Sequence, residues 1–550
     1  MIGSWRVVAR IVPSALVSIA FVAEARAADV EVDGETAFQA YEVQSPWGDV
    51  VLERRRLLQT LGLGVYNLQG KYRPGEADYS LVLKLRLDAD FGINNHLQGG
   101  TGSETTYGTS PRPGERYIPG LQAYPVDIMY AWIEGRNLAG GWFGFRAGRQ
   151  YISDVLGWWS FDGGLARVTT PYYFQAEVYG GLEQRGGLPL STPRYERQGV
   201  WRGSHADFGG SGQPNTGDYP SYLFTEPAPA FGVALESSGP SFVHGRFDYR
   251  RVYNTGNVLT QQFPDPGGGY RSARGARISQ ERIGYAADIN KDDLGGLKGG
   301  IAYDIYNQLV GNFYGGIEAY LGHRVIVGVD IDYFEPTYDG DSIWNWFTKS
   351  PITTLLGRTS IDVTDRFDVS ASGGVRLWTT DGDPDSFGRG QCQVAGLAEN
   401  CFETGAFFDP YDNGNLEAYS RADENRGAVT SNDLLLNLAG RYRWETAVVS
   451  LRGMLQSGKT GRRTGADLSG DKKLDGGRYS VGARVSLYDW NDPLRPPERE
   501  GATSFSYVLG GGWRPADIAD VRLEWEHDMN ELAGQRYRIV ALLNLHWGTR

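Results

Sequence analysis

The chain has 550 residues, a formal net charge of −12, 76 glycines, 15 tryptophans and 32 tyrosines, but only two cysteines. Glycine and aromatic residues at this frequency favour many strands and tight turns. The acidic balance argues against a nucleic-acid-binding function, and no segment after the N-terminus has the roughly 18 apolar residues that a membrane-spanning helix needs.

Residues 1–27 have the features of a secretory signal. Arg6 and Arg10 precede an apolar run, and small residues flank a cleavage point before Ala28. We therefore expect a signal peptide over residues 1–27 and a single exported domain over residues 28–550.

The segment YSLVLKLRLDADF, residues 79–91, alternates between two kinds of side chain. Apolar residues occupy the odd positions, and Lys84, Arg86, Asp88 and Asp90 occupy even positions. A period of two predicts a strand with two unlike faces. The same pattern recurs along the chain, for example at residues 243–250, 323–334, 521–528 and 537–547.

Short turns and long polar loops separate these strands. Turn-like pairs stand at residues 365–366 and 444–445, and the long loops cover residues 93–124, 183–228, 254–277, 335–353 and 380–430. This asymmetry is typical of outer-membrane barrels. The sequence therefore predicts an all-β, transmembrane antiparallel β-barrel with short periplasmic turns and long extracellular loops.

The expected strand number is about 18, within a range of 16 to 20. The patterns give 20 or 21 candidate strands, and bacterial barrels of one chain have an even number, so at least one candidate is wrong. Segments 35–43 and 162–170 are weak candidates, and the alternation of loop lengths is lost between residues 458 and 501.

A location in a lipid bilayer explains which face of each strand contacts water and which contacts lipid. Lipid accepts a continuous apolar outer face, and an enclosed lumen keeps charged side chains in water. A soluble β-sandwich is the alternative, and it would have to expose many such charged faces in addition to carrying a signal peptide. We therefore predict localisation in the bacterial outer membrane, in contact with its lipid.

The alternation assigns one set of polar side chains to the lumen. The predicted pore-lining residues are Lys84, Arg86, Asp88, Asp90, Arg146, Arg149, Arg246, Asp248, Arg250, Asp330, Asp332, Arg376, Arg441, Arg443, Arg452, Arg484, Arg522 and Glu524. Opposed rows of arginine and carboxylate can simply brace a wide lumen. They can also offer many weak hydrogen bonds to a hydroxyl-rich or charged solute, which lets it pass without becoming trapped.

Other sequence motifs give only weak indications of ligand binding or catalysis. The run GMLQSGKT at 453–460 fits the phosphate-loop pattern, but no helix follows it, so we read it as chance. Residues 467–475 resemble a calcium loop but lack the acid at its twelfth position, so we expect a solvated loop and no metal site. No nucleophile motif is present, so the chain is not expected to be an enzyme or to need a cofactor.

Two further groups of residues have candidate roles. Cys392 and Cys401 are close enough in sequence to bridge, and a secreted protein favours this disulfide. Aromatic faces stack on sugars and acids bind hydroxyl groups, so sugar contact is one role for Trp158, Trp159, Asp339, Asp341, Trp344 and Trp346. An aromatic girdle at the membrane interface is the alternative.

Residues 145–168 resemble outer-membrane porins of the alginate-export type. The resemblance consists of Gly148-Arg149-Gln150 at the end of a strand, the pair Trp158-Trp159, and Asp162-Gly163 before the next strand. Residues 53–68 add a weaker likeness. The resemblance implies an 18-stranded barrel with an arginine-lined lumen that releases polysaccharide.

On this basis the leading expectation is a pore for polysaccharide secretion. Its partners would be the polysaccharide cargo and a separate periplasmic polysaccharide-export protein, with no nucleic acid. The alternative is a diffusion porin for the uptake of small polar or anionic solutes.

Overall fold

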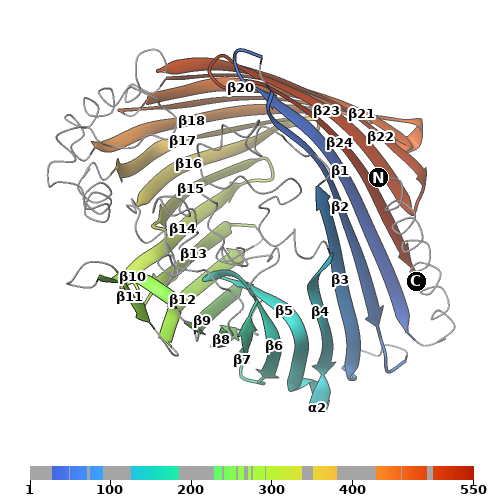
Figure 1. Cartoon of the computed structure of the whole chain (residues 1–550), viewed down its shortest axis with the longest axis vertical. Helices are drawn as coiled ribbons and strands as arrows, with labels where there is room; N and C mark the ends of the chain where they lie inside the picture. Colours follow the sequence, from blue (N-terminus) through green and yellow to red (C-terminus); the bar gives the residue numbers. More distant parts are fainter. Residues whose placement is uncertain are drawn as a thin grey trace, which may run out of the picture.

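One closed antiparallel sheet of 22 strands contains most of the described chain (Figure 1). The computed structural model describes residues 28–48, 50–70, 75–90, 126–184, 228–237, 241–254, 258–264, 270–273, 277–291, 293–336, 351–380, 429–459, 461–491 and 500–549. Each strand of the sheet pairs with the strands before and after it, and β1 pairs with β24 to close the barrel.

The first nine strands make up the part of the wall that carries the candidate site. They are β1 (Asp29–Gln44), β2 (Val50–Tyr66), β3 (Asp78–Asp90), β4 (Val126–Asn137), β5 (Phe143–Asp154), β6 (Gly157–Thr169), β7 (Phe174–Glu183), β8 (Pro229–Ser237) and β9 (Val243–Asn254). A separate small hairpin of β10 (Val258–Pro264) and β11 (Tyr270–Ala273) follows β9.

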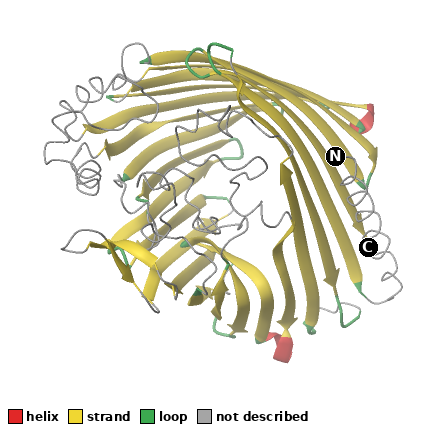
Figure 2. Ribbon diagram, in the orientation of Figure 1, coloured by secondary structure: helices red, strands yellow, loops and turns green. Residues whose placement is uncertain are grey.

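The remaining thirteen strands complete the barrel. They are β12 (Arg277–Lys291), β13 (Gly295–Asp304), β14 (Leu309–Leu321), β15 (Val325–Phe334), β16 (Ile352–Thr364), β17 (Phe367–Thr380), β18 (Val429–Arg443), β19 (Ala447–Gly458), β20 (Gly461–Leu474), β21 (Tyr479–Asn491), β22 (Gly501–Ala516), β23 (Ala519–Asn530) and β24 (Gly534–Gly548). The two short helices among the described residues, α2 (Leu138–Gly141) and η3 (Asp475–Gly477), lie at turns between strands (Figure 2). Within the described part of the chain, no helix is long and apolar enough to cross a membrane.

The prediction of a closed antiparallel β-barrel is confirmed, but the predicted number of about 18 strands is wrong. The weak candidates at 35–43 and 162–170 belong to the full strands β1 and β6. The run from 467 to 474, expected to be a loop, lies in β20, and the phosphate-loop pattern lies in β19 and the turn after it. Only residues 459–460 separate β19 from β20, which is why the alternation of loop lengths fails there.

The two ends of the barrel differ in the length of their connections. Neighbouring strands are antiparallel, so successive connections alternate between the ends. The five long connections all leave the same end, which we call the long-loop end: 91–125, 184–228, 255–276, 335–351 and 381–428. The other end is the short-turn end, where β1 begins and β24 finishes.

The two faces of the wall have opposite chemistry, as β14 to β16 illustrate. Ile317 and Val329 face each other across β14 and β15, and both side chains are exposed. One residue further along, Glu318 accepts a hydrogen bond of 2.7 Å from Arg358 on the other face. An apolar outer face in lipid and a charged inner face in water satisfy both sets of side chains.

Candidate functional site

The far end of β5 and β6 leaves the wall and crosses the inside of the barrel. Pairing of β5 with β4 ends at Arg149, whereas pairing of β5 with β6 continues to the turn at Val155 and Leu156. A Cβ built on Gly284 of β12 would lie 2.4 Å from Val155 Cγ1 and 2.7 Å from Leu156 Cδ2. Since β7, β8 and β9 separate β6 from β12, the tip must span their inner face, and in Figure 1 β5 curves into the barrel. We call residues 149–162 the inward hairpin.

A row of glycines marks the line at which the inward hairpin bends. Gly148, Gly163 and Gly181 lie opposite one another on β5, β6 and β7. A Cβ would lie 2.2 Å from the Ala131 carbonyl oxygen at Gly148, and 2.1 Å from the Gly180 carbonyl oxygen at Gly163. Gly148 also has φ of +130°, which L side chains rarely adopt. Only glycine allows the strands to approach this closely while the sheet turns.

Apolar packing holds the hairpin against the wall. Trp159 and Phe161 stack at 4.4 Å on the side of the hairpin that faces β7 to β9, and both side chains are buried. They pack with Tyr179 and Val252, which are also buried. Burial of such a side chain contributes roughly 1.5–3 kcal/mol, so this cluster is strong enough to fix the hairpin in place.

A buried arginine ties the hairpin tip to β9. The Arg250 side chain is among the largest fully buried ones, and its Nη2 donates a hydrogen bond of 3.1 Å to the Leu156 carbonyl oxygen. Its Nη1 lies 3.7 Å from Asp154 Oδ2, and its guanidinium lies 5.3 Å from the Trp159 ring centroid. A buried charge is stable only when it is paired, so Arg250 and the tip depend on each other.

A second arginine gathers three carboxylates beside this contact. Arg246 donates to Glu177 at 2.9 Å, to Glu236 at 2.7 Å and to Asp248 at 2.9 Å. Three strands of the inner wall, β7, β8 and β9, therefore meet through one charged network. The sequence prediction included Arg246, Asp248 and Arg250 but missed the two glutamates, although each alternates with apolar neighbours in its strand.

Arg149 fastens the hairpin on its other side. Its Nε and Nη2 donate to Asp162 Oδ1 and Oδ2 at 2.7 and 2.9 Å. Its Nη1 donates to the Ile128 carbonyl oxygen of β4 at 2.9 Å. The pair therefore joins β5, β6 and β4 at the position where regular strand pairing stops.

Four aromatic rings line the gap between β4 and the inward hairpin, and we call them the aromatic ladder. Tyr130 and Trp132 of β4 lie 4.8 Å apart, and Tyr151 of β5 lies 5.7 and 5.8 Å from them. Trp158 of β6 stacks on Tyr151 at 4.6 Å with an interplanar angle of 17°. Its side chain is 43% exposed, whereas the Trp159 side chain is 3% exposed. Of the four tryptophans predicted to contact sugar, Trp158 and Trp159 lie in this arrangement, and of these two only Trp158 is open to a solute.

Several of the other predicted pore-lining residues form ion pairs on the inner face. Asp330 accepts from Arg358 at 2.6 Å, and Lys84 pairs with Asp33 of β1. Arg441 and Arg443 both reach Asp368, and Arg146 donates to Glu134 at 3.1 Å. The sequence prediction found the arginines in these pairs more often than their acids. It also missed Arg358, which alternation within β16 could have identified.

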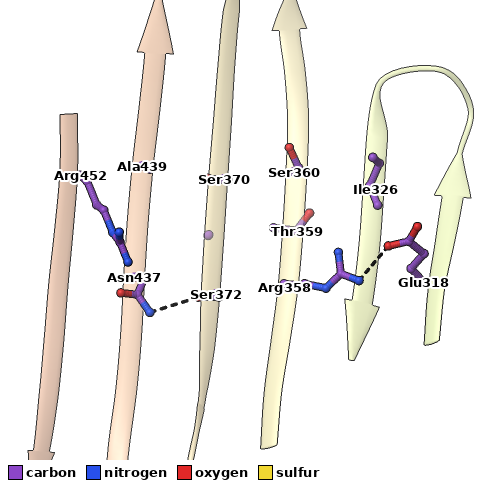
Figure 3. Close-up of a pocket in the computed structure, with 11 residues that line it drawn as sticks. Glu318, Ile326, Arg358, Thr359, Ser360, Ser370, Ser372, Asn437, Ala439 and Arg452 are labelled. Atoms are coloured by element: carbon purple, nitrogen blue, oxygen red, sulfur yellow. Dashed lines mark hydrogen bonds and ion pairs between the residues drawn. The ribbon is translucent and has the colours of Figure 1, made fainter. Parts of the chain in front are cut away.

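A hollow lined by several serines, which we call the serine hollow, lies on the inner wall formed by β14 to β19 (Figure 3). Its volume is about 480 Å³, and Arg358 and Arg452 stand at its two sides. Asn437 donates to Ser372 at 3.2 Å across its floor. Short side chains on β17 create the hollow, whose lining residues are Glu318, Ile326, Arg358, Thr359, Ser360, Ser370, Ala371, Ser372, Asn437, Ala439 and Arg452.

The remaining predicted residues are placed as follows. Arg376 lies opposite Asp433, Arg484 lies opposite Ser469, and Arg522 donates to Asp520. Arg86, Asp332 and Glu524 occupy strand positions on β3, β15 and β23. The side chains of Asp88 and Asp90, and all of Asp339, Asp341, Trp344, Trp346, Cys392 and Cys401, lie outside the described residues, so the predicted disulfide stays a prediction. Among the described residues, no group of three or more His, Cys, Asp or Glu could hold a metal ion.

Comparison with known proteins gives structural matches only. No protein-family model matches the sequence, and no curated protein matches it. Solved structures with a similar fold include Pseudomonas aeruginosa OpdK with vanillate (TM-score 0.37, 8% identity), Acinetobacter baumannii OccAB2 (0.39, 9%) and P. aeruginosa OccK5, also called OpdH (0.38, 7%). Each match covers 95% of this chain and 98 to 99% of the other protein.

These findings correct the family expectation. None of the structures named above is an alginate-export porin, and the barrel has 22 strands where the resemblance implied 18. The predicted alginate-export family is therefore wrong, as is polysaccharide secretion with its polymer cargo and periplasmic partner. The prediction of an outer-membrane location is confirmed: the chain is a β-barrel of the bacterial outer membrane.

Proposed function

We propose that this chain is a diffusion porin that takes up small polar or anionic solutes across the outer membrane. The observation that carries the proposal is the inward hairpin, which crosses the inner face from β6 to β12 and is fixed there by packing and by Arg250. A fixed element of this kind narrows a wide barrel without closing it, which suits the selection of small solutes by size. Residues 1–27 would be the signal peptide, and residues 28–550 the single barrel domain.

The charge pattern of the inner face supports passage of polar solutes. Cations and carboxylates alternate at short distances, as in the pairs of Arg358 with Asp330 and of Arg146 with Glu134. Paired groups bind a passing solute weakly, and weak, repeated sites allow it to leave as readily as it enters. We include the predicted pore-lining residues on the inner face in this proposal.

Reconstitution in planar bilayers tests the proposal. The chain should form steady ion-conducting channels that are open without a partner protein. A variant in which two glycines replace residues 151–160 should conduct more than the natural chain, because it lacks the narrowing element. A folded barrel that does not conduct, or one whose conductance is the same after this deletion, would contradict the proposal.

A further inference from the structure

We propose that the aromatic ladder is a binding site for a pyranose ring of a mono- or oligosaccharide. This inference rests on the proposed function, since it takes the gap beside the inward hairpin to be part of the solute path. It adds a chemical class of solute and a place where that solute is held.

The ladder offers the surface that a sugar ring requires. A pyranose has an apolar C–H face that packs against the face of an aromatic ring, and its hydroxyl groups project around the edge. Trp158 presents an exposed indole at one end of the ladder, stacked on Tyr151 at 4.6 Å. From Tyr151 the rings continue to Tyr130 and Trp132 in steps of 5.7 and 5.8 Å. A ring can therefore move from one aromatic face to the next.

Two hydrogen-bond donors at the inner end of the ladder lack a partner in the described chain. They are Trp132 Nε1 and Arg146 Nε, both buried, and the Arg146 guanidinium lies 4.9 Å from the Trp132 ring centroid. A buried donor without an acceptor is costly, so a sugar hydroxyl that reaches these donors after a small shift of the side chains around them gains a hydrogen bond. Glu134, which is buried beside Arg146, supplies carboxylate oxygens that can accept from a sugar hydroxyl.

The charges around the ladder favour a neutral polyol over an anion or a plain aromatic solute. Arg146 shares Glu134 with Arg136, which also interacts electrostatically with Asp78. Arg149 is paired with Asp162, so the positive charges of these arginines are balanced by carboxylates. Both pairs place donors and acceptors next to ring faces. A sugar uses both kinds of group, whereas a benzene ring uses neither and a carboxylate uses only the donors.

Current block by sugars tests this site. With the channel reconstituted, glucose and maltotriose should interrupt the ion current in a concentration-dependent way. Trp158→Ala should weaken the block by about tenfold, equivalent to about 1.4 kcal/mol, and Trp158→Phe should retain most of it. Trp142→Ala is the matched control, because Trp142 is an exposed tryptophan that follows α2 at the short-turn end, and it should leave the block unchanged.

The outcomes separate this inference from the porin proposal. Equal block of natural and Trp158→Ala channels, or no block by either sugar in a conducting channel, would overturn the sugar site and leave the porin standing. Stronger block by benzoate than by glucose would likewise overturn it in favour of an aromatic solute. If the barrel does not conduct, isothermal titration calorimetry of the detergent-solubilised protein still measures sugar binding: binding that Trp158→Ala abolishes supports the site, and no binding to the natural chain overturns it.

Discussion

Arg149 and Asp162 face each other across β5 and β6 through two parallel hydrogen bonds of 2.7 and 2.9 Å, at the point where β5 leaves β4. The arginine also donates a hydrogen bond to the Ile128 carbonyl oxygen of β4, which lies before the first β4 residue that pairs with β5, Ala131. One residue pair thus fixes the position at which a wall strand becomes an element inside the barrel.

Removal of this pair should loosen the hairpin without unfolding the barrel. Arg149→Ala removes bonds to both β6 and β4, but the pair is partly exposed, so the loss of stability should be only about 1 kcal/mol. The channel current should become noisier because the hairpin moves. Arg324→Ala, which breaks the exposed pair with Asp365 at the short-turn end, is the control and should leave the current steady. Identical noise in the two variants would contradict the role of Arg149.

Loss of the buried arginine should be more severe. Arg250→Ala leaves Asp154 and the Leu156 carbonyl oxygen without their partner and removes the contact with Trp159. Breaking a buried pair typically costs 3–5 kcal/mol. Thermal unfolding in detergent should shift to a lower temperature, and limited proteolysis should cut within residues 149–162. A variant as stable and as protease-resistant as the natural chain would show that the tip is not anchored there.

The glycine row can be tested with two neighbouring residues. Gly163→Ala places a Cβ 2.1 Å from a backbone oxygen, whereas the nearest atom to a Cβ at Gly164 lies 3.8 Å away. We therefore expect Gly163→Ala to cost about 1–3 kcal/mol and Gly164→Ala to be tolerated. Chemical unfolding of the two variants side by side measures the difference. Equal stability would mean that the strands do not approach as closely at the bend.

Substitution of Arg452 tests directly which face of the sheet lines the water-filled lumen. Arg452 is exposed beside the serine hollow, so Arg452→Glu should shift the permeability ratio towards cations, on the order of twofold. Arg462→Glu is the control, because Arg462 lies on the same outer face as the exposed Leu468. The reversal potential in a salt gradient measures both variants. A larger shift for Arg462 would show that the two faces were assigned backwards.

The local sequence pattern was sufficient to predict the strands of the barrel wall, but it did not predict that the inward hairpin bends into the barrel. The alternation in residues 79–91 predicts β3 and the inner position of Lys84, because a strand's two faces depend only on its own residues. The segment FGFRAGRQYISD reads in the same way, as an ordinary wall strand. Its bend depends on Gly148, Gly163 and Gly181 meeting across three strands, and that register exists only in the folded sheet.

The motif behind the family resemblance has a structural explanation. Gly148, Arg149 and Asp162 lie at the bend, and Trp158 and Trp159 occupy opposite sides of the inward hairpin. These residues therefore report how β5 and β6 turn inward, and they are no evidence for a polysaccharide cargo. The expected number of 18 strands is too low because segments 35–43 and 162–170, which are weak by pattern, belong to the full strands β1 and β6, and because only residues 459–460 separate β19 from β20.

The central claim is that the β5–β6 tip lies against β12 across the inside of the barrel. Val155→Cys and Gly284→Cys, combined in a chain with Cys392→Ser and Cys401→Ser, should place two sulfur atoms within disulfide distance. We expect the bond to form spontaneously in the folded barrel and to shift its migration in a non-reducing gel, with the shift lost on reduction. A folded double-cysteine barrel in which both thiols stay free, even with an added oxidant, would contradict the account.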